Sequence, residues 1–126
     1  MISKINKSNI KFKLDLSNQI VLTEAATGNY SCTPIIALQA GASKVYALAK
    51  KTSYGNYEDI ENEFVNYKSD KRLKVIKSLD EIDDKIDIVT NSGFVRPINH
   101  NIIKFLDRKS VVTLMYEPWE FRASDI

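Results

Sequence analysis

The chain has 126 residues, of which 44% are hydrophobic and 27% are charged, and its formal net charge is +2. This size and composition indicate one globular domain and exclude wholesale disorder, while the balance of charges excludes a dedicated nucleic-acid binder. The single cysteine, Cys32, excludes an internal disulfide, and the single histidine, His100, excludes a His-rich metal site. No stretch is apolar for long enough to span a membrane, and residues 1–13 lack the apolar core of a signal peptide, so we expect a cytoplasmic protein.

The small net charge conceals an uneven distribution along the chain. Residues 1–57 contain seven lysines and two acids, a net charge of +5, whereas residues 58–126 contain eleven basic and fourteen acidic residues, a net charge of −3. Four of the seven lysines lie within the first thirteen residues, which is typical of a solvated arm or an edge strand. We therefore divide the chain into an N-terminal basic arm or edge strand (1–18) and one domain (19–126).

The first predicted element is an edge strand at Ile10–Leu16, where apolar and polar residues alternate strictly. Five short apolar runs follow, each rich in Val, Ile, Leu and Thr and bounded by polar residues, Gly or Pro. They are Gln19–Glu24, Lys44–Ala49, Leu73–Ile76, Ile86–Asn91 and Val111–Met115. Continuous apolar runs of this length are typical of strands that are buried on both faces, as in a parallel sheet.

Helical patterns separate these runs. Thr33 is the predicted N-cap of a helix that has a proline in its first turn and ends before Gly41. The next helix is predicted within Tyr57–Tyr67, from apolar residues spaced three to four positions apart. A capping-box spacing at Ser78–Glu81 predicts a very short helix, and Asn99–Leu106 is predicted to form the last one.

The alternation of strands and helices predicts an α/β fold, a three-layer Rossmann-like sandwich with a mostly parallel sheet of about five strands. The N-terminal edge strand would be an addition to this sheet. No internal repeat and no Pro/Gly/Ser-rich linker marks a second domain. Because five strands use nearly the whole length, we expect a cofactor-type domain without a substrate domain, or a fragment of a longer enzyme. The open sheet edges also predict self-association as a homodimer or another homo-oligomer.

The loop after the first strand is the leading candidate for a ligand site, because ligands bind parallel sheets beyond the carboxyl ends of the strands. A turn into a helix N-terminus presents free N–H groups, which suit a pyrophosphate or a carboxylate. Gly28 allows the backbone to approach a phosphate, although a plain strand-to-helix turn with one glycine is the alternative interpretation. The candidate residues here are Glu24, Ala25, Thr27, Gly28, Asn29, Tyr30 and Ser31.

Two further strand ends supply the other candidates. The second strand is followed by two lysines and a threonine, without the acid that NAD-binding folds place there to hold the ribose hydroxyls. This favours a 2′-phosphate and hence NADP over NAD, although exposed lysines also simply solvate a strand end. The fourth strand is followed by small polar residues that would contact a ribose or a ring, or form an ordinary glycine turn. These candidates are Lys50, Lys51, Thr52, Asn91, Ser92 and Gly93.

No residue carries a convincing catalytic role, so the catalytic residues stay unassigned, and no metal site is predicted. His100 is interpreted as a helix-capping or surface residue rather than a general base. Cys32 precedes the predicted helix, where its thiol pKa would be lowered if exposed, but small buried packing is the simpler interpretation. The segment Tyr116–Arg122 combines two carboxylates, an arginine and three aromatic residues, and is predicted to pack over the sheet or against a partner.

The segment Asp80–Arg122 resembles the cofactor domain of NAD(P)-dependent dehydrogenases of the 2-hydroxyacid dehydrogenase and adenosylhomocysteinase type. The similarity lies in a strand that ends in small polar residues (DIVTNSG), a following helix, and the run Leu106–Val112 before the last strand. Together with the loop around Gly28, which resembles G-A-T-G-x-x-G, it extends over about residues 19–117. It implies a Rossmann domain that binds NADP or NAD within an oxidoreductase, but the family's catalytic Arg, Glu and His have no match here.

Two alternatives remain open. Val21–Gly28 also resembles the V-L-(D/E)-x-G-x-G loop of S-adenosylmethionine-dependent methyltransferases, which implies S-adenosylmethionine as the cofactor. Lys50 stands where that family usually has an acid. A non-catalytic nucleotide-sensing or subunit-interaction module fits the short chain and its aromatic C-terminal segment. The sequence leaves open whether the chain is an enzyme; the main hypothesis is a dinucleotide-binding domain without a nucleic-acid or membrane partner.

Overall fold

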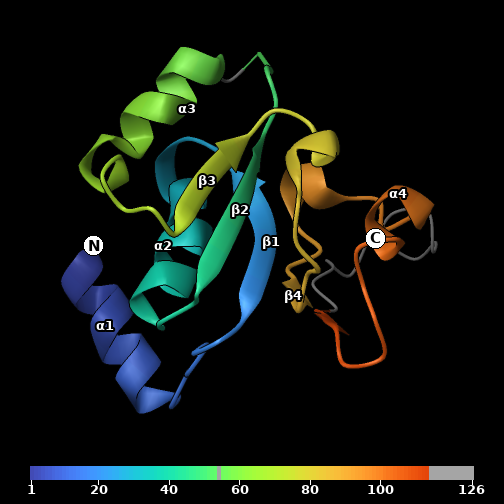
Figure 1. Cartoon of the computed structure of the whole chain (residues 1–126). Helices are drawn as coiled ribbons and strands as arrows, with labels where there is room; N and C mark the ends of the chain where they lie inside the picture. The colour runs from blue at the N-terminus through green and yellow to red at the C-terminus, as the bar shows by residue number, and fades with distance from the viewer. Residues whose placement is uncertain (54, 114–126) are drawn as a thin grey trace, which may run out of the picture.

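The computed structural model describes residues 1–53 and 55–113. Within them, five parallel strands form one sheet in the order β3-β2-β1-β4-β5. The chain winds outward from β1 to β3 and then crosses back to β4, so the strand order reverses between β1 and β4 (Figure 1). This confirms the predicted α/β fold with a five-stranded parallel sheet. The strands are β1 (Ile20–Ala25), β2 (Lys44–Ala49), β3 (Leu73–Ile76), β4 (Ile88–Val89) and β5 (Val111–Val112).

Helices cover both faces of the sheet, which completes a three-layer arrangement (Figure 1). Side chains of the first three α-helices pack on one face of the sheet, and side chains of a short turn and of the last α-helix pack on the other. The α-helices are α1 (Ile2–Lys11), α2 (Cys32–Gln39), α3 (Tyr57–Glu63) and α4 (His100–Ile103). The single 3-10 turns are η1 (Gly28–Ser31), η2 (Val65–Tyr67), η3 (Leu79–Glu81) and η4 (Gly93–Val95).

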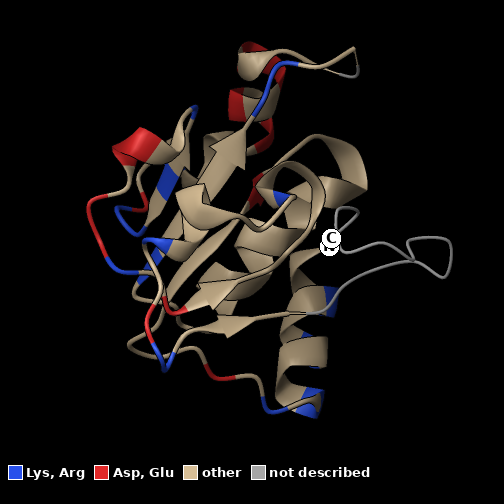
Figure 2. Ribbon diagram, turned by 90° about the vertical axis from the view of Figure 1, so that its right-hand side faces the viewer, with Lys and Arg blue, Asp and Glu red and all other residues tan. Residues whose placement is uncertain are grey.

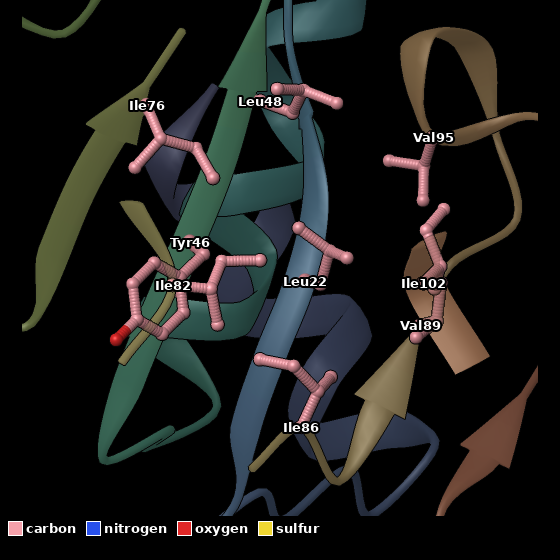
Figure 3. Close-up of a cluster of buried hydrophobic side chains, with 9 residues drawn as sticks. All are labelled: Leu22, Tyr46, Leu48, Ile76, Ile82, Ile86, Val89, Val95 and Ile102. Atoms are coloured by element: carbon pink, nitrogen blue, oxygen red, sulfur yellow. The ribbon is translucent and has the colours of Figure 1, made fainter. Parts of the chain in front are cut away.

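Side chains of the central strands alternate between these two faces, as the pleat of a strand requires. Leu22 of β1 and Leu48 of β2 join Val95 of η4 and Ile102 of α4 in one buried cluster (Figure 3). The alanines of β1 and β2 face the opposite cluster, where small side chains let α1, α2 and α3 pack closely on the sheet. Both faces are therefore buried, which explains why the strands are continuous apolar runs in the sequence.

The N-terminal region differs from its prediction, because no strand forms at Ile10–Leu16. Residues Ile2–Lys11 form α1 instead, and Ile5 and Asn9, one helical turn apart, are its buried side chains. The Asn9 side chain donates to a backbone carbonyl of α2 at 3.5 Å. Three of the four apolar residues in the alternating stretch are exposed, so the period of two did not mark a buried face. The packing of one face of α1 against α2 therefore explains why this region is helical.

Two helix boundaries are also displaced from their predicted positions. The predicted cap Thr33 lies inside the first turn of α2, whose N-cap is Ser31, because η1 runs directly into the helix. The helix predicted within residues 57–67 ends early: Phe64, which is 3% exposed, anchors the end of α3 in the core, and η2 follows. The capping box at Ser78–Glu81 is confirmed, as is the stop at Gly41, which has a φ of +91°.

Two further predictions concern the C-terminal part of the chain. The last strand is observed at Val111–Val112, while the rest of the predicted run, from residue 114 onward, lies outside the described residues. The aromatic segment Tyr116–Arg122 also lies outside them. Among the described residues, no helix is long and apolar enough to cross a membrane.

Candidate functional site

The carboxyl ends of β1 and β4 form the point where the strand order reverses, and this is where open parallel sheets bind ligands. Backbone pairing between the two strands ends with Leu22 and Val89, followed by one bond from the Thr90 N–H to the Leu22 carbonyl at 3.2 Å. Beyond this point side chains connect the strands. The hydroxyl of Thr90 lies 3.0 Å from that of Thr23 and 3.0 Å from that of Ser92.

Glu24, the penultimate residue of β1, extends from this strand end toward the turn after β4. The residue is 7% exposed, and its carboxyl group accepts hydrogen bonds from the Ser92 hydroxyl and the Phe94 backbone N–H. Burial raises the pKa of Glu24 above its usual value, whereas these two hydrogen bonds and the positive charge of Arg96 act in the opposite direction. A buried carboxyl at a strand end, held by the next loop rather than by a direct ion pair, is typical of a functional position.

Gly93 is required for this arrangement. Its φ is +50°, and a Cβ at this position would lie 1.5 Å from the Glu24 Oε2. The carboxyl group therefore occupies the space that any other residue would fill, and it rests directly on the backbone of η4. Gly93 was a candidate residue in the sequence, as a contact to a ribose or ring or as a turn glycine, but its close approach to Glu24 was not predicted.

Asn91 is the second buried polar residue at this edge. It is 2% exposed, has a φ of +46°, and its Oδ1 has no hydrogen-bond partner among the described residues. Its backbone carbonyl accepts a hydrogen bond of 2.9 Å from the Nε of Arg96. A buried acceptor without a partner carries a free-energy penalty of about 1–3 kcal/mol, which a ligand donor relieves. Asn91 and Glu24 thus both bring acceptor oxygens to this edge.

The β1–α2 loop lies beside this cluster, and two of its donors are already engaged. Gly28 has a φ of +64°, and its N–H donates to the Glu63 Oε1 at 3.1 Å. The Ser31 hydroxyl, proposed as a phosphate donor, donates instead to the Gly28 carbonyl at 2.7 Å. Ala25 is fully buried in the core, so only its backbone faces the loop. Glu63 was missed in the sequence, because a contact across 35 residues leaves no local pattern.

The end of β2 lies next to this loop. Ala25 and Ala49 are paired in register, so Lys50 follows beside the first residues of the loop. Lys50, Lys51 and Thr52 are all exposed, as predicted for residues that meet a ligand or solvent. In Figure 2 the acidic segments of α3 lie at the end of the sheet where the strands terminate.

The remaining candidates lie farther from these contacts. Asn29 and Tyr30 are exposed on η1, with Tyr30 70% exposed, and Thr27 is half-buried beside Gly55. The Cys32 Sγ lies 3.2 Å from the Met1 Sδ, and His100 is the exposed first residue of α4, which supports a surface role. No group of three metal-ligating side chains occurs within residues 1–53 and 55–113.

One groove lies away from this edge. Its volume is about 610 Å³, and α1, the residues after it and the C-terminal end of α2 line it. Because α2 runs back toward the amino ends of the strands, this groove opens at the opposite edge of the sheet from Glu24. It is separate from the candidate site.

Comparison with known proteins identifies the fold. No protein-family profile and no curated protein matches the sequence. A solved precorrin-6y C5,15-methyltransferase from Geobacter metallireducens GS-15 is similar in structure, with a TM-score of 0.55 and 13% identity over 88% of this chain. A proposed hemolysin from Lactococcus lactis has a TM-score of 0.42 and 21% identity over 69% of this chain. The chain spans 58% and 41% of the lengths of these proteins. At such identity, the first similarity establishes a Rossmann-like fold.

Proposed function

We propose that this chain is a methyltransferase-like domain that binds S-adenosylmethionine at the carboxyl ends of β1 and β4. The observation that carries the proposal is the buried carboxyl group of Glu24 at the point where the strand order reverses. A carboxylate offers acceptors to amine and hydroxyl groups and attracts a cation. S-adenosylmethionine contains a sulfonium cation, an amino group and two ribose hydroxyls, so its chemistry suits an edge of this character.

The same observation argues against a dinucleotide, which was the main hypothesis from the sequence. The pyrophosphate of NADP would bring negative charge to a loop that begins just after Glu24 and is hydrogen-bonded to the carboxylate of Glu63. Like charges repel one another, and the Gly28 N–H would first have to lose its present acceptor. The fold similarity to a methyltransferase and the resemblance of Val21–Gly28 to a methyltransferase loop support the S-adenosylmethionine reading.

One observation favours NADP as the second candidate. Lys50 and Lys51 are exposed at the end of β2, beside the loop, where an acid would hold the ribose hydroxyls of S-adenosylmethionine. Two lysines at this position suit a 2′-phosphate instead. The charges at the two neighbouring strand ends therefore favour different ligands, which makes a direct binding experiment decisive.

The experiment measures the free energy of unfolding with S-adenosylmethionine, S-adenosylhomocysteine, NADPH and NADH. A ligand at 100 times its Kd adds about 2.7 kcal/mol to the free energy of unfolding. We expect the two adenosyl compounds to stabilise the protein and the two dinucleotides to have little effect. Stabilisation by NADPH alone, lost in Lys50→Glu but kept in Lys68→Glu, would refute the proposal in favour of the oxidoreductase reading.

A further inference from the structure

Glu63 is an acid in a position that does not suit its own helix. It is the last residue of α3, and the last turn of that helix contains no basic residue. A negative charge at the C-terminal end of a helix is unfavourable, whereas Glu58 and Asp59 in the first turn are favourable. The requirements of α3 therefore account for its first two acids but not for Glu63.

The contact that Glu63 makes lies in the ligand loop. Its Oε1 accepts the N–H of Gly28 at 3.1 Å, and both residues are exposed. Gly28 has a left-handed φ, and the N–H of such a glycine is the group with which a strand-to-helix loop binds a phosphate oxygen. In this protein a carboxylate from another helix, 35 residues away, holds that N–H.

We infer that Glu63 determines ligand specificity in the proposed site by excluding nucleotides that carry a phosphate at this loop. A phosphate would have to displace the carboxylate and then bind beside its negative charge. A ligand whose group at the loop is neutral or positively charged meets neither obstacle. This inference rests on the proposed function and adds a substrate class to it: adenosyl compounds without phosphate.

The acidic surroundings strengthen the exclusion. α3 also carries Glu61, and Figure 2 shows its acidic residues gathered at the end of the sheet where the strands terminate. Glu63 is hydrogen-bonded to the loop, so its charge acts at contact distance. At a separation of about 4 Å in water, one like charge weakens binding of one phosphate charge by about fivefold, and by more where water is partly excluded.

The test compares Glu63→Gln with Glu61→Gln. Glutamine keeps an oxygen that accepts the Gly28 N–H, so the loop retains its shape while the charge is lost. The control removes one charge from the same exposed helix without touching the loop. Binding of S-adenosylmethionine, S-adenosylhomocysteine, AMP, ADP and NADPH is measured by calorimetry at low salt and again at 0.5 M NaCl.

We expect Glu63→Gln to bind AMP, ADP or NADPH at least fivefold more tightly than the wild type, and S-adenosylmethionine no more tightly. Glu61→Gln should change each affinity less than twofold. The gain should shrink in high salt, because it comes from charge. Equal effects of the two variants, or an equal gain for every ligand, would overturn the inference. Failure of the proposed function is separate, since it would show in the wild type as no binding of either adenosyl compound.

Discussion

The two edges of the sheet hold their charged groups in different ways. At the amino edge, acids pair with bases: Lys44 at the start of β2 with Asp84, Arg72 before β3 with Asp70, and Lys85 before β4 with Asp107. At the carboxyl edge, Glu24 and Glu63 accept hydrogen bonds from hydroxyl and backbone N–H groups of neighbouring loops. These three ion pairs lie at the edge without the candidate site.

This difference indicates that the charged groups of the amino edge stabilise the fold, whereas those of the carboxyl edge can bind a ligand. In an ion pair each charge is balanced by the other, so the charged groups of the amino edge do not require a charged ligand. The Asp84 carboxylate also accepts a hydrogen bond from Tyr46, whose side chain is fully buried, and thus joins the edge to the core. A carboxylate that is held by backbone and hydroxyl donors, with the positive charge of Arg96 nearby, keeps oxygen acceptors available to a ligand. We therefore expect substitutions at the carboxyl edge to affect ligand binding and substitutions at the amino edge to affect stability alone.

Glycine substitutions should give the largest difference. Gly93→Ala places a Cβ 1.5 Å from the Glu24 Oε2 at a φ of +50°, so the carboxyl group must leave its donors. We expect a loss of about 2–4 kcal/mol in the free energy of unfolding and loss of adenosyl-ligand binding. Gly41→Ala is the matched control, because the φ of Gly41 is +91° but a Cβ there would come no closer to another atom than 3.5 Å, from the Ser17 Oγ. In Gly41→Ala the free energy of unfolding should fall by about 1 kcal/mol and adenosyl-ligand binding should be kept, as measured by urea denaturation and calorimetry.

Removal of an acid at the amino edge should affect stability alone. Asp84→Ala leaves the hydroxyl of buried Tyr46 without its carboxylate acceptor and Lys44 without its ion pair. We expect the free energy of unfolding to fall by about 1–2 kcal/mol, while the ligand affinity stays within twofold of the wild type. Asp83→Ala removes an adjacent exposed acid and serves as the control. A matching loss of ligand affinity in Asp84→Ala would break the proposed separation between the two edges.

The smallest effect, a pH dependence, should have opposite signs at the two edges. Burial raises the pKa of Glu24 above its usual 4.5, so the folded state binds more protons than the unfolded state just above that pH. The free energy of unfolding should therefore decrease as pH rises from 4.5 through the raised pKa, and Glu24→Gln should remove this decrease. The Lys44 ammonium and the Tyr46 hydroxyl lower the pKa of Asp84 below 3.8, so its contribution is lost only as pH falls below 3.8.

These signs are measurable by urea denaturation between pH 3 and pH 8. Asp84→Asn should be less stable than the wild type by a constant amount above pH 4.5, and the difference should shrink as pH falls below 3.8. A Glu24→Gln curve parallel to the wild type between pH 4.5 and pH 8 would mean that burial does not control this carboxyl group.

The sequence predicted the parts of the fold that local patterns control. β2 and β3 lie at the predicted residues, because short runs rich in Val, Ile and Leu and bounded by polar residues favour strands whether they become a central strand, as β2 does, or an edge strand, as β3 does. The prediction of a strand at Ile10–Leu16 was wrong, because the alternation of apolar and polar residues there is only a local pattern. The structure of this region depends instead on the burial of Ile5 and Asn9 against α2, which is a tertiary effect.

The candidate site shows the same limit. Glu24 and Gly93 were both identified as candidate residues, from their positions at strand ends, and the structure brings them into contact. Their relation depends on β4 lying beside β1, a pairing of segments 67 residues apart that no local pattern expresses. Glu63 was missed entirely, because on its own helix it is an ordinary exposed acid. Its contact with Gly28 arises only from the crossover after β2.

The hydroxyl groups of Thr23, Thr90 and Ser92 have a consequence for how this fold can change over evolution. The last backbone hydrogen bond between β1 and β4 runs from the Thr90 N–H to the Leu22 carbonyl, and beyond it these three hydroxyls connect the strands. Substitutions at the three positions would change the spacing of the strand ends without altering the strand register. The edge that carries the candidate site can therefore be adapted to new ligands one residue at a time, while the sheet beneath it stays the same.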